Sequence, residues 1–278
     1  MAHWRLDGQC ALVTGGTKGL GLACVEEFLN LGAKVLFTAR SADDLEAVGR
    51  ELREKHGDEV QWIAADVSTR EGRDTLVDRA SQLWSGRLDI LVNNVGTNKR
   101  LTMSEVDEEA WSVQVDTNMT GAFFLCKACL PLLRKSDYAS VVNVTSLAGM
   151  RSSGTGVVYA MTKAAVNHMS AALACEWAPF KIRVNAVAPW MVLTPLLEEA
   201  TRNDPAQLRR VCDATPLGRL GAVEDTANAV SFLCMRASKY ITGQVFAVDG
   251  GLSAQGFRGP CVKRPPAAEG GGVKRPRV

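Results

Sequence analysis

Residues 9–21 read QCALVTGGTKGLG, a short apolar run that leads into a glycine-rich turn. We expect a strand over residues 9–14 and an amphipathic helix over residues 20–31. The amino end of such a helix offers free N–H groups to an anion. This strand, turn and helix predict a dinucleotide-binding unit, with an ordinary turn between a strand and a helix as the alternative.

The glycines of this turn have separate expected roles. Gly15 permits a tight turn, Gly19 lets the backbone approach a diphosphate closely, and Gly21 permits close packing of the helix on the strand. The expected cofactor contacts in the turn are Gly15, Thr17, Lys18, Gly19 and Leu20.

Strand and helix patterns alternate along the rest of the chain. The alternation predicts a parallel sheet with right-handed crossovers and helices on both faces. The expected fold class is α/β, a single-domain Rossmann-like doubly wound parallel sheet of about seven strands, within a catalytic domain at residues 1–254. Further strands are expected at residues 33–39, 60–64, 88–92, 139–145, 182–187 and 244–248, and further helices at residues 43–55, 70–84, 105–134, 156–178 and 223–235.

Residues 190–212 depart from this alternation because they contain no clear strand. Long ordered segments of this kind are often lids. We therefore expect an ordered loop that closes over a mostly apolar ligand. The expected substrate contacts in this loop are Trp190, Val192 and Leu196.

Length and composition limit the class of protein. The chain has 278 residues, 46% of them hydrophobic, which suffices for one full core. No membrane-spanning apolar run and no secretion signal is visible, so a soluble, cytoplasmic protein is expected. The eight cysteines are scattered through predicted core elements and the three histidines are far apart. Free buried thiols are expected, and no metal site.

The last residues, 255–278, form a basic tail rich in proline and glycine. They have little apolar surface to bury, so disorder is expected. The runs KRPP from Lys263 and KRPR from Lys274 resemble short nuclear-import signals, with a merely solvated tail as the alternative. Because the positive charge gathers in the tail, the rest of the chain is slightly acidic and gives no electrostatic reason to bind nucleic acid.

The end of the second strand is expected to reach the adenosine ribose of a dinucleotide. An acidic residue there usually accompanies NAD, whereas a basic residue accommodates the 2′-phosphate of NADP. This chain has Arg40, and Lys18 and Ser41 could add a second cation and a hydroxyl donor. We therefore expect NADP(H), a preference that Asp43 or Asp44 would weaken only by facing the ribose.

Two further strand ends carry expected cofactor contacts. Asp66 and Val67 follow the third strand, where the carboxylate could accept a hydrogen bond from the adenine amino group. The NNVG run begins at Asn93, and we expect its amides mainly to brace the turn by bonding to backbone. Gly96, at the end of this run, lets the cofactor approach closely.

Residues 146–163 read SLAGMRSSGTGVVYAMTK and bring together a hydroxyl, a phenol and an amine. Tyr159 and Lys163 are four residues apart, so they lie on one face of a helix. An ammonium beside a phenol lowers the phenol's pKa from about 10. Ser146 follows a strand and could hold a carbonyl oxygen. The alternative is a serine that ends a strand, a packed tyrosine and a solvated lysine.

Asn118 lies within the long helical region expected at residues 105–134. Asparagine is unfavourable inside a helix. We expect it to open a local hydrogen bond and to hold a water that connects Lys163 to solvent.

These motifs resemble a known family. TGGTKGLG, NNVG, Asn118, Ser146 and YAMTK occur in the order and spacing of the short-chain dehydrogenase/reductase family, over about residues 6–254. The runs WRLDGQCALVTGGTKGLG, CEWAPFKIRVNAVAP and FLCMRASKYITGQVFAVDGGL resemble most the tropinone reductase-like branch.

The resemblance implies roles for single residues. Tyr159 would be the general acid/base, Lys163 would lower its pKa and bind the nicotinamide ribose, Ser146 would donate a hydrogen bond to the substrate, and Asn118 would hold the relay water. Thr194 would bind the carboxamide, and Pro189 would lie in the nicotinamide pocket, although Trp190 stands where the family has a glycine. Homodimers or homotetramers, formed through the helices that carry Asn118 and Tyr159, are also implied.

Together these predictions describe an NADP(H)-dependent oxidoreductase that transfers a hydride between the nicotinamide and a small to medium, mostly apolar ketone or secondary alcohol. One alternative is a 3-oxoacyl-carrier-protein reductase, which would use Lys127, Arg134 and Lys135 to meet an acidic carrier. A second is a non-catalytic NADP-binding protein that acts through its tail. Against this second alternative, all four expected catalytic residues are present.

Overall fold

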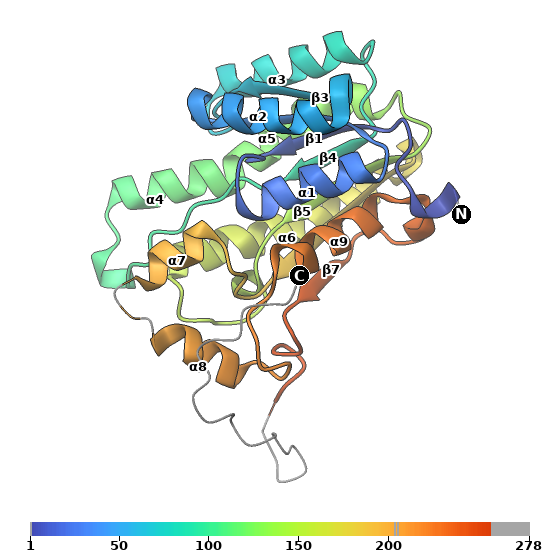
Figure 1. The fold of residues 1–278 in the computed structure, drawn as a ribbon. Coiled ribbons are helices and arrows are strands. Elements are labelled where there is room, and N and C mark those ends of the chain that lie inside the picture. Colours follow the sequence, from blue (N-terminus) through green and yellow to red (C-terminus); the bar gives the residue numbers. More distant parts are fainter. Residues whose placement is uncertain (1, 203, 205, 257–278) are drawn as a thin grey trace.

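The computed structural model describes residues 2–202, 204 and 206–256, and its centre is one parallel sheet (Figure 1). The sheet has seven strands in the order β3-β2-β1-β4-β5-β6-β7, with every neighbouring pair parallel. The doubly wound α/β fold and the strand number are therefore confirmed. The strands are β1 (Cys10–Thr14), β2 (Lys34–Ala39), β3 (Val60–Ala64), β4 (Ile90–Asn93), β5 (Ala139–Val144), β6 (Ile182–Pro189) and β7 (Val245–Val248).

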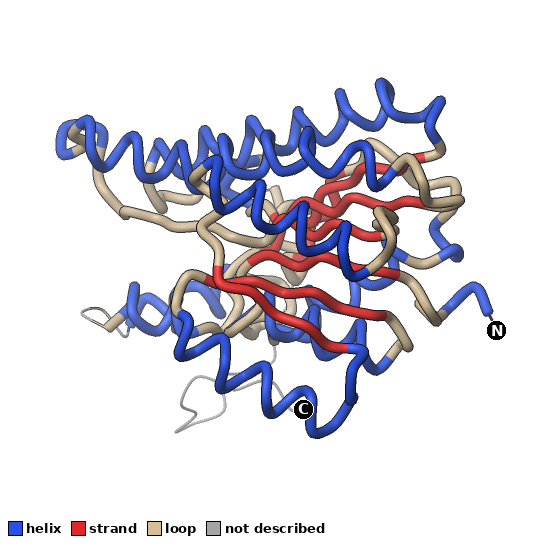
Figure 2. Tube along the Cα trace, turned by 90° about the horizontal axis from the view of Figure 1, so that it is seen from above, coloured by secondary structure: helices blue, strands red, loops and turns tan. Residues whose placement is uncertain are grey.

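Helices cover both faces of this sheet, as the view from above shows (Figure 2). Helices α1, α2 and α9 contribute to the buried cluster on one face, and α3, α5 and α6 to the cluster on the other. The bounds are α1 (Gly19–Asn30), α2 (Ala42–His56), α3 (Arg70–Leu83), α4 (Glu108–Val115), α5 (Gly121–Leu133), α6 (Val157–Trp177), α7 (Pro195–Thr201), α8 (Ala206–Ala214) and α9 (Val223–Cys234).

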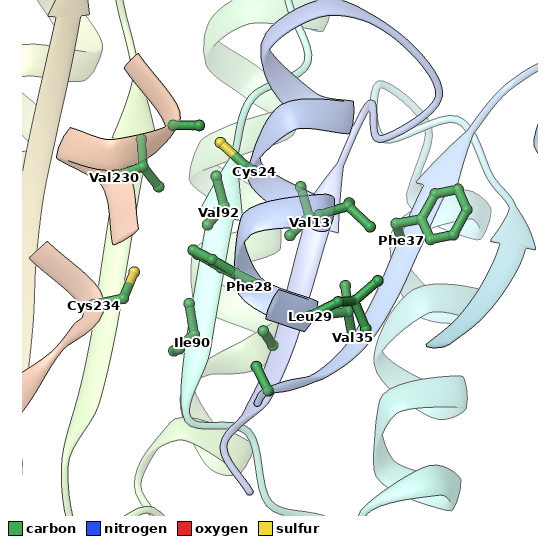
Figure 3. Close-up of a cluster of buried hydrophobic side chains, with 14 of the residues drawn as sticks. Val13, Cys24, Phe28, Leu29, Val35, Phe37, Ile90, Val92, Val230 and Cys234 are labelled. Carbon is green, nitrogen blue, oxygen red and sulfur yellow. The ribbon is translucent and has the colours of Figure 1, made fainter. Parts of the chain in front are cut away.

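The central strands β1, β4 and β5 are buried along their whole length and mostly apolar, because helices cover both faces of the sheet. In β1, for example, Val13 packs in the cluster beneath α1, whereas Leu12 packs in the opposite cluster. Figure 3 shows the first cluster, in which Phe28 of α1 lies between the strands and α9. Side chains alternate between faces along a strand, so the two cores share one sheet.

The long helix expected at residues 105–134 is divided into three parts. A π-helix, Asp116–Thr120, separates α4 from α5 and contains Asn118. Asp107 caps α4 by accepting from the Ala110 N–H at 2.7 Å. Short π-helical segments inside α-helices often occur at functional sites. Asn118, which we expect to open a local hydrogen bond, lies in the middle of this segment.

The expected loop at residues 190–212 is wrong, because most of this segment is helical. Thr194 caps α7 by accepting from the Leu197 N–H at 3.3 Å, and Pro195 occupies the first turn, where its missing N–H costs nothing. Helices α7 and α8 are held by a small apolar cluster of Leu197, Val211 and Leu220. This packing is tertiary, so the local sequence pattern does not reveal it.

The cysteines are mostly buried, but not all of them. Five are buried and free, whereas Cys175 is exposed and Cys212 is partly buried, which corrects the expectation of uniformly buried thiols. Cys261 and the rest of the basic tail after residue 256 lie outside the described residues. No helix in the described part of the chain is both long and apolar enough to cross a membrane.

Candidate functional site

The candidate site lies at the carboxyl ends of three adjacent strands. β1, β4 and β5 are neighbours in the sheet, and they are followed respectively by the glycine turn, the NNVG run and Ser146. Ligands of open parallel sheets bind outside these strand ends. The fold therefore gathers three separately predicted motifs at one edge.

The glycine turn has the backbone that a phosphate cradle requires. Gly15 has φ +70°, a conformation that favours glycine, and a Cβ on Gly21 would overlap the carbonyl oxygen of Gly15. The close packing expected of Gly21 is confirmed. Lys18 precedes α1 and its side chain makes no capping hydrogen bond. No side chain at this end competes with an anion for the first N–H groups of α1, so the turn fits a diphosphate.

Arg40 is the first residue after β2 and is exposed. Ser41 caps α2 by accepting from the Asp44 N–H at 3.3 Å. A hydroxyl that accepts a hydrogen bond can still donate its own proton. Within the described residues Arg40 forms no ion pair. The side chains of Arg40 and Ser41 could therefore both bind a phosphate.

Asp66 and Val67 form a turn after β3. The Asp66 Oδ1 accepts from the backbone N–H of Ser68 at 2.9 Å and from its hydroxyl at 2.7 Å. The carbonyl of Val67 accepts from the buried Arg73 at 2.8 Å. The carboxylate expected at the adenine is thus held in place by its own turn.

The two amides of the NNVG run have different roles. Asn94 donates to the carbonyls of Thr14, at 2.9 Å, and Gly15, at 3.2 Å, so it braces the glycine turn as expected. For Asn93 the same expectation is wrong. As the last residue of β4 it points into the core, where it donates to the Asn143 Oδ1 at 2.8 Å. Its side chain supports the sheet edge from within.

Asn118 joins the segment after NNVG to the helix that carries Tyr159. Its Oδ1 accepts from the Thr97 N–H at 2.7 Å, and its Nδ2 donates to the Thr97 carbonyl at 2.9 Å and to the Thr162 hydroxyl at 3.2 Å. Both N–H donors of the amide are therefore used by protein groups, whereas Oδ1 retains one acceptor site. The relay water expected at this residue stays a prediction.

Tyr159 and Lys163 lie on the first turns of α6, and both face Ser146 at the end of β5. Lys163 is 4% exposed, and its ammonium donates to the Val144 carbonyl at 3.1 Å and lies 5.8 Å from the centre of the Tyr159 ring. Burial lowers the pKa of Lys163 to about 8. A Cβ on Gly96 would come within 3.1 Å of the Lys163 Nζ, so this position must stay small.

The pKa of Tyr159 departs from its expected direction. Burial raises it, and a hydrogen bond with Ser146 and the positive charge of Arg100 partly oppose this rise. The expectation that Lys163 lowers it is not met here, because the ammonium is directed to the Val144 carbonyl and burial disfavours the phenolate. At neutral pH the phenol is therefore protonated and can donate.

The residues predicted after β6 are only partly brought to this site. The Thr194 methyl carbon lies 3.4 Å from where a Cβ on Gly19 would be, so α7 begins beside the glycine turn. Pro189 ends β6, and the Trp190 N–H donates to the Val248 carbonyl at 3.0 Å. The side chain of Leu196 is outside what the structure describes.

Trp190 and Val192 line a cavity of about 160 Å³ that opens beside Thr226 and Asp249. None of Ser146, Tyr159 and Lys163 belongs to its lining. The expected substrate contacts of Trp190 and Val192 therefore stay a prediction. Within the described ranges no group of three or more His, Cys, Asp or Glu side chains could hold a metal ion.

Two residues near this site, Arg100 and Gln114, were not predicted from the sequence. Gln114 is fully buried and accepts from the Lys99 N–H at 3.1 Å. A single arginine a few residues after NNVG belongs to no pattern, and a glutamine on a helix is ordinary. Only in the folded chain does Gln114 hold the segment that carries Arg100.

Comparisons with known proteins agree with this geometry. A family model described as enoyl-(acyl carrier protein) reductase matches residues 15–253. A chloroplastic tropinone reductase homolog of Arabidopsis thaliana is 45% identical over 255 residues, which are 92% of this chain and 79% of that protein.

Two solved structures are similar over almost their whole length. A putative short-chain alcohol dehydrogenase from Sinorhizobium meliloti has a TM-score of 0.84 at 35% identity, covering 90% of this chain and 98% of that one. A gluconate 5-dehydrogenase from Burkholderia cenocepacia, in complex with NADP and tartrate, has a TM-score of 0.85 at 29% identity, covering 91% and 98%.

The extent of these matches decides the family. The resemblance carried by TGGTKGLG, NNVG and YAMTK is confirmed, and several relatives are named tropinone reductase homologs. The chain belongs to the short-chain dehydrogenase/reductase family of oxidoreductases.

Proposed function

We propose that this chain is an NADP(H)-dependent oxidoreductase that interconverts a ketone and its secondary alcohol. The observation that carries the proposal is the assembly of Ser146, Tyr159, Lys163 and Asn118 beside the glycine turn, at one edge of the sheet. When bound, the nicotinamide supplies or accepts the hydride. All other groups needed for the proton transfer are side chains of this chain.

The two hydroxyls divide the remaining work. The side chains of Ser146 and Tyr159 are hydrogen-bonded to each other, so a substrate carbonyl oxygen could accept hydrogen bonds from both hydroxyls. Tyr159, protonated at neutral pH, donates its proton to this oxygen during reduction. The Ser146 hydroxyl stabilises the negative charge that develops there. Lys163, whose buried ammonium lies 5.8 Å from the centre of the Tyr159 ring, would donate hydrogen bonds to the nicotinamide ribose.

The preference for NADP(H) rests on Arg40, with Lys18 and Ser41 as further contacts for a 2′-phosphate. All three are accessible and lie at the ends of β1 and β2. The gluconate 5-dehydrogenase structure named above contains NADP, which supports the same preference.

Replacing Arg40 by aspartate is expected to reverse this preference. A charge-assisted hydrogen bond contributes about 1.5–3 kcal/mol, so the Kd of NADPH should rise by about 10–100-fold while that of NADH stays equal or falls. Nicotinamide fluorescence measures both constants. The matched control is Lys239→Asp, an equal charge change at an exposed position. An unchanged ratio of the two constants in Arg40→Asp would contradict the assignment.

The carrier-protein reductase is less well supported. Its basic cluster includes Arg134 and Lys135, which directly follow α5. The Leu88 N–H donates to the Leu132 carbonyl at 3.2 Å, which puts the end of α5 at the amino end of β4. The cluster therefore lies at the edge of the sheet opposite to Ser146, too far to guide an acidic carrier to the catalytic hydroxyls.

An oligomer that buries α4 and α5 is part of the proposal. Trp111, Phe123 and Phe124 on these helices are between 42% and 46% exposed. Aromatic side chains grouped on a surface often mark an interface between proteins. Light scattering of the purified chain gives the number of subunits.

The experiment that tests the function is direct. NADPH and NADH are titrated onto the purified protein, and a panel of ketones is then followed by NADPH consumption. Preferred binding of NADPH with turnover of some ketone supports the proposal. Tight NADPH binding without turnover on a broad panel would favour a binding protein instead.

A further inference from the structure

We propose that Arg100 is a specificity residue that binds an acidic group of the substrate, so that the substrate is a ketone carrying a carboxylate, or the matching hydroxy acid. The inference rests on the proposed function and narrows its substrate class. It replaces the mostly apolar ketone expected from the sequence. The argument starts from the segment that holds Arg100, residues 97–101, which we call the strap.

The strap is held to α4, the π-helix and α6 at three points. Asn118 bonds to both the N–H and the carbonyl of Thr97, and the buried Gln114 accepts from the Lys99 N–H. On the third side it packs on Gly156, just before α6, where a Cβ would lie 3.4 Å from the Lys99 carbonyl oxygen. Gly156 has φ +108°, a backbone that suits glycine. The strap is thus fixed next to the first turn of α6.

The carbonyl oxygens of Lys99 and Leu101, on either side of Arg100, lie 3.4 and 3.6 Å from where a Cβ on Gly156 would be, so Arg100 lies beside the first turn of α6, which carries the catalytic phenol. The positive charge of Arg100 acts on Tyr159 and lowers the pKa of that phenol against the effect of burial. On its other side, an Arg100 Nη1 donates to the Gln207 Oε1 of α8 at 3.4 Å. Arg100, on the strap, therefore lies between α6 and α8, at the same edge of the sheet as the reacting hydroxyls.

The burial of Arg100 has a cost that its protein contacts offset only in part. Burial lowers its pKa, and no carboxylate of the described residues pairs with it. A guanidinium has five N–H donors, and one long contact to an amide leaves most of them unused. A partly buried cation without an acid is unfavourable. A substrate carboxylate, which accepts two parallel N–H bonds from arginine, would offset this cost.

Two other interpretations of Arg100 remain testable. It could serve only to tune Tyr159, in which case every substrate would be affected equally. It could also be a solvated surface charge, in which case no substrate would be affected. The neighbouring Lys99 gives a matched control, because it is an exposed cation on the same strap.

The experiment compares Arg100→Met, Lys99→Met and the unchanged protein on a panel of oxo acids, each paired with its methyl ester. Loss of a hydrogen bond to a charged group costs about 1.5–3 kcal/mol, so kcat/KM for the oxo acids should fall about 10–100-fold in Arg100→Met, mainly through KM. The esters should change by less than about threefold. Lys99→Met should leave the ratio of acid to ester unchanged. Equal losses on acids and esters, or no loss, would overturn the proposal.

A binding measurement separates this inference from the proposed function. Calorimetry with the same oxo acids, on protein saturated with NADP⁺, which has no hydride to transfer, requires no turnover. Binding by the unchanged protein that weakens in Arg100→Met but not in Lys99→Met supports the acid site even if no ketone is reduced. Turnover of neutral ketones with no effect of Arg100 would leave the function standing and overturn the acid site.

A third variant protects the test against misfolding of Arg100→Met. Gln207→Glu puts a carboxylate beside the intact Arg100, where it competes with the substrate. We expect KM for the oxo acids to rise about tenfold while that of the esters stays unchanged. An unchanged KM for the acids would count against the proposed site.

Discussion

Replacing Tyr159 by phenylalanine is expected to lower kcat for ketone reduction by about 10²–10⁴-fold, the contribution typical of a positioned general acid. The substitution keeps the ring that packs on α6 and removes only the hydroxyl. Because Arg40, Lys18 and the glycine turn are untouched, the Kd of NADPH should stay within about twofold. The measurement is single-turnover NADPH oxidation, which separates the chemical step from cofactor release.

The control for this variant is Tyr240→Phe, since Tyr240 is fully exposed. It loses the same hydroxyl at a position far from any described partner in the site, so its turnover should match that of the unchanged protein. Near-normal turnover of Tyr159→Phe would refute the proton donor assigned here. A parallel loss in both variants would point to a general effect on folding.

The sequence predicted the architecture well because the relevant signals are local. Each strand is a short run of apolar residues, and glycines such as Gly15 and Gly21 are demanded by the backbone of one turn. The order of motifs such as YAMTK then identified the family. What these signals share is that their physical cause lies within a few neighbouring residues.

The features that were missed depend on contacts between distant segments. Asn93 and Asn94 are adjacent and chemically identical, yet only Asn94 braces the turn, because strand alternation sends Asn93 into the core. Likewise, the YxxxK spacing places an ammonium near a phenol but does not reveal that burial dominates the pKa of Tyr159. Arg100 acts on that phenol only because the strap is folded against α6.

The buried ammonium of Lys163 leads to the second prediction with a large effect, which concerns stability. Burial lowers the pKa of Lys163 from 10.5 to about 8, so the charged form is penalised in the folded protein. Below about pH 8 the side chain is charged in both states, and the penalty is fully present. Between about pH 8 and 10.5 the unfolded chain binds more protons than the folded one, so stability rises with pH.

Lys163→Met removes this titration and should therefore change the pH dependence of the free energy of unfolding. Relative to the variant, the unchanged protein should gain most of about 3 kcal/mol between pH 7 and 10.5, the free-energy equivalent of the lowered pKa. The quantity compared is the difference in the free energy of unfolding between the two proteins at each pH. The variant also loses the hydrogen bond to the Val144 carbonyl, but this loss is the same at every pH and does not change the pH dependence. Urea unfolding at several pH values measures the free energy of unfolding of each protein.

The matched control is Lys127→Met, since Lys127 is exposed on α5. The difference in the free energy of unfolding between this control and the unchanged protein should not vary with pH between 7 and 10.5. If the Lys163 ammonium were hydrated in the folded state, the difference in the free energy of unfolding between Lys163→Met and the unchanged protein would also not vary with pH. Such a result would contradict the burial of this charge. A difference that shifts in favour of the unchanged protein as the pH rises would mean that burial of the charged lysine lowers the stability of the folded protein at neutral pH.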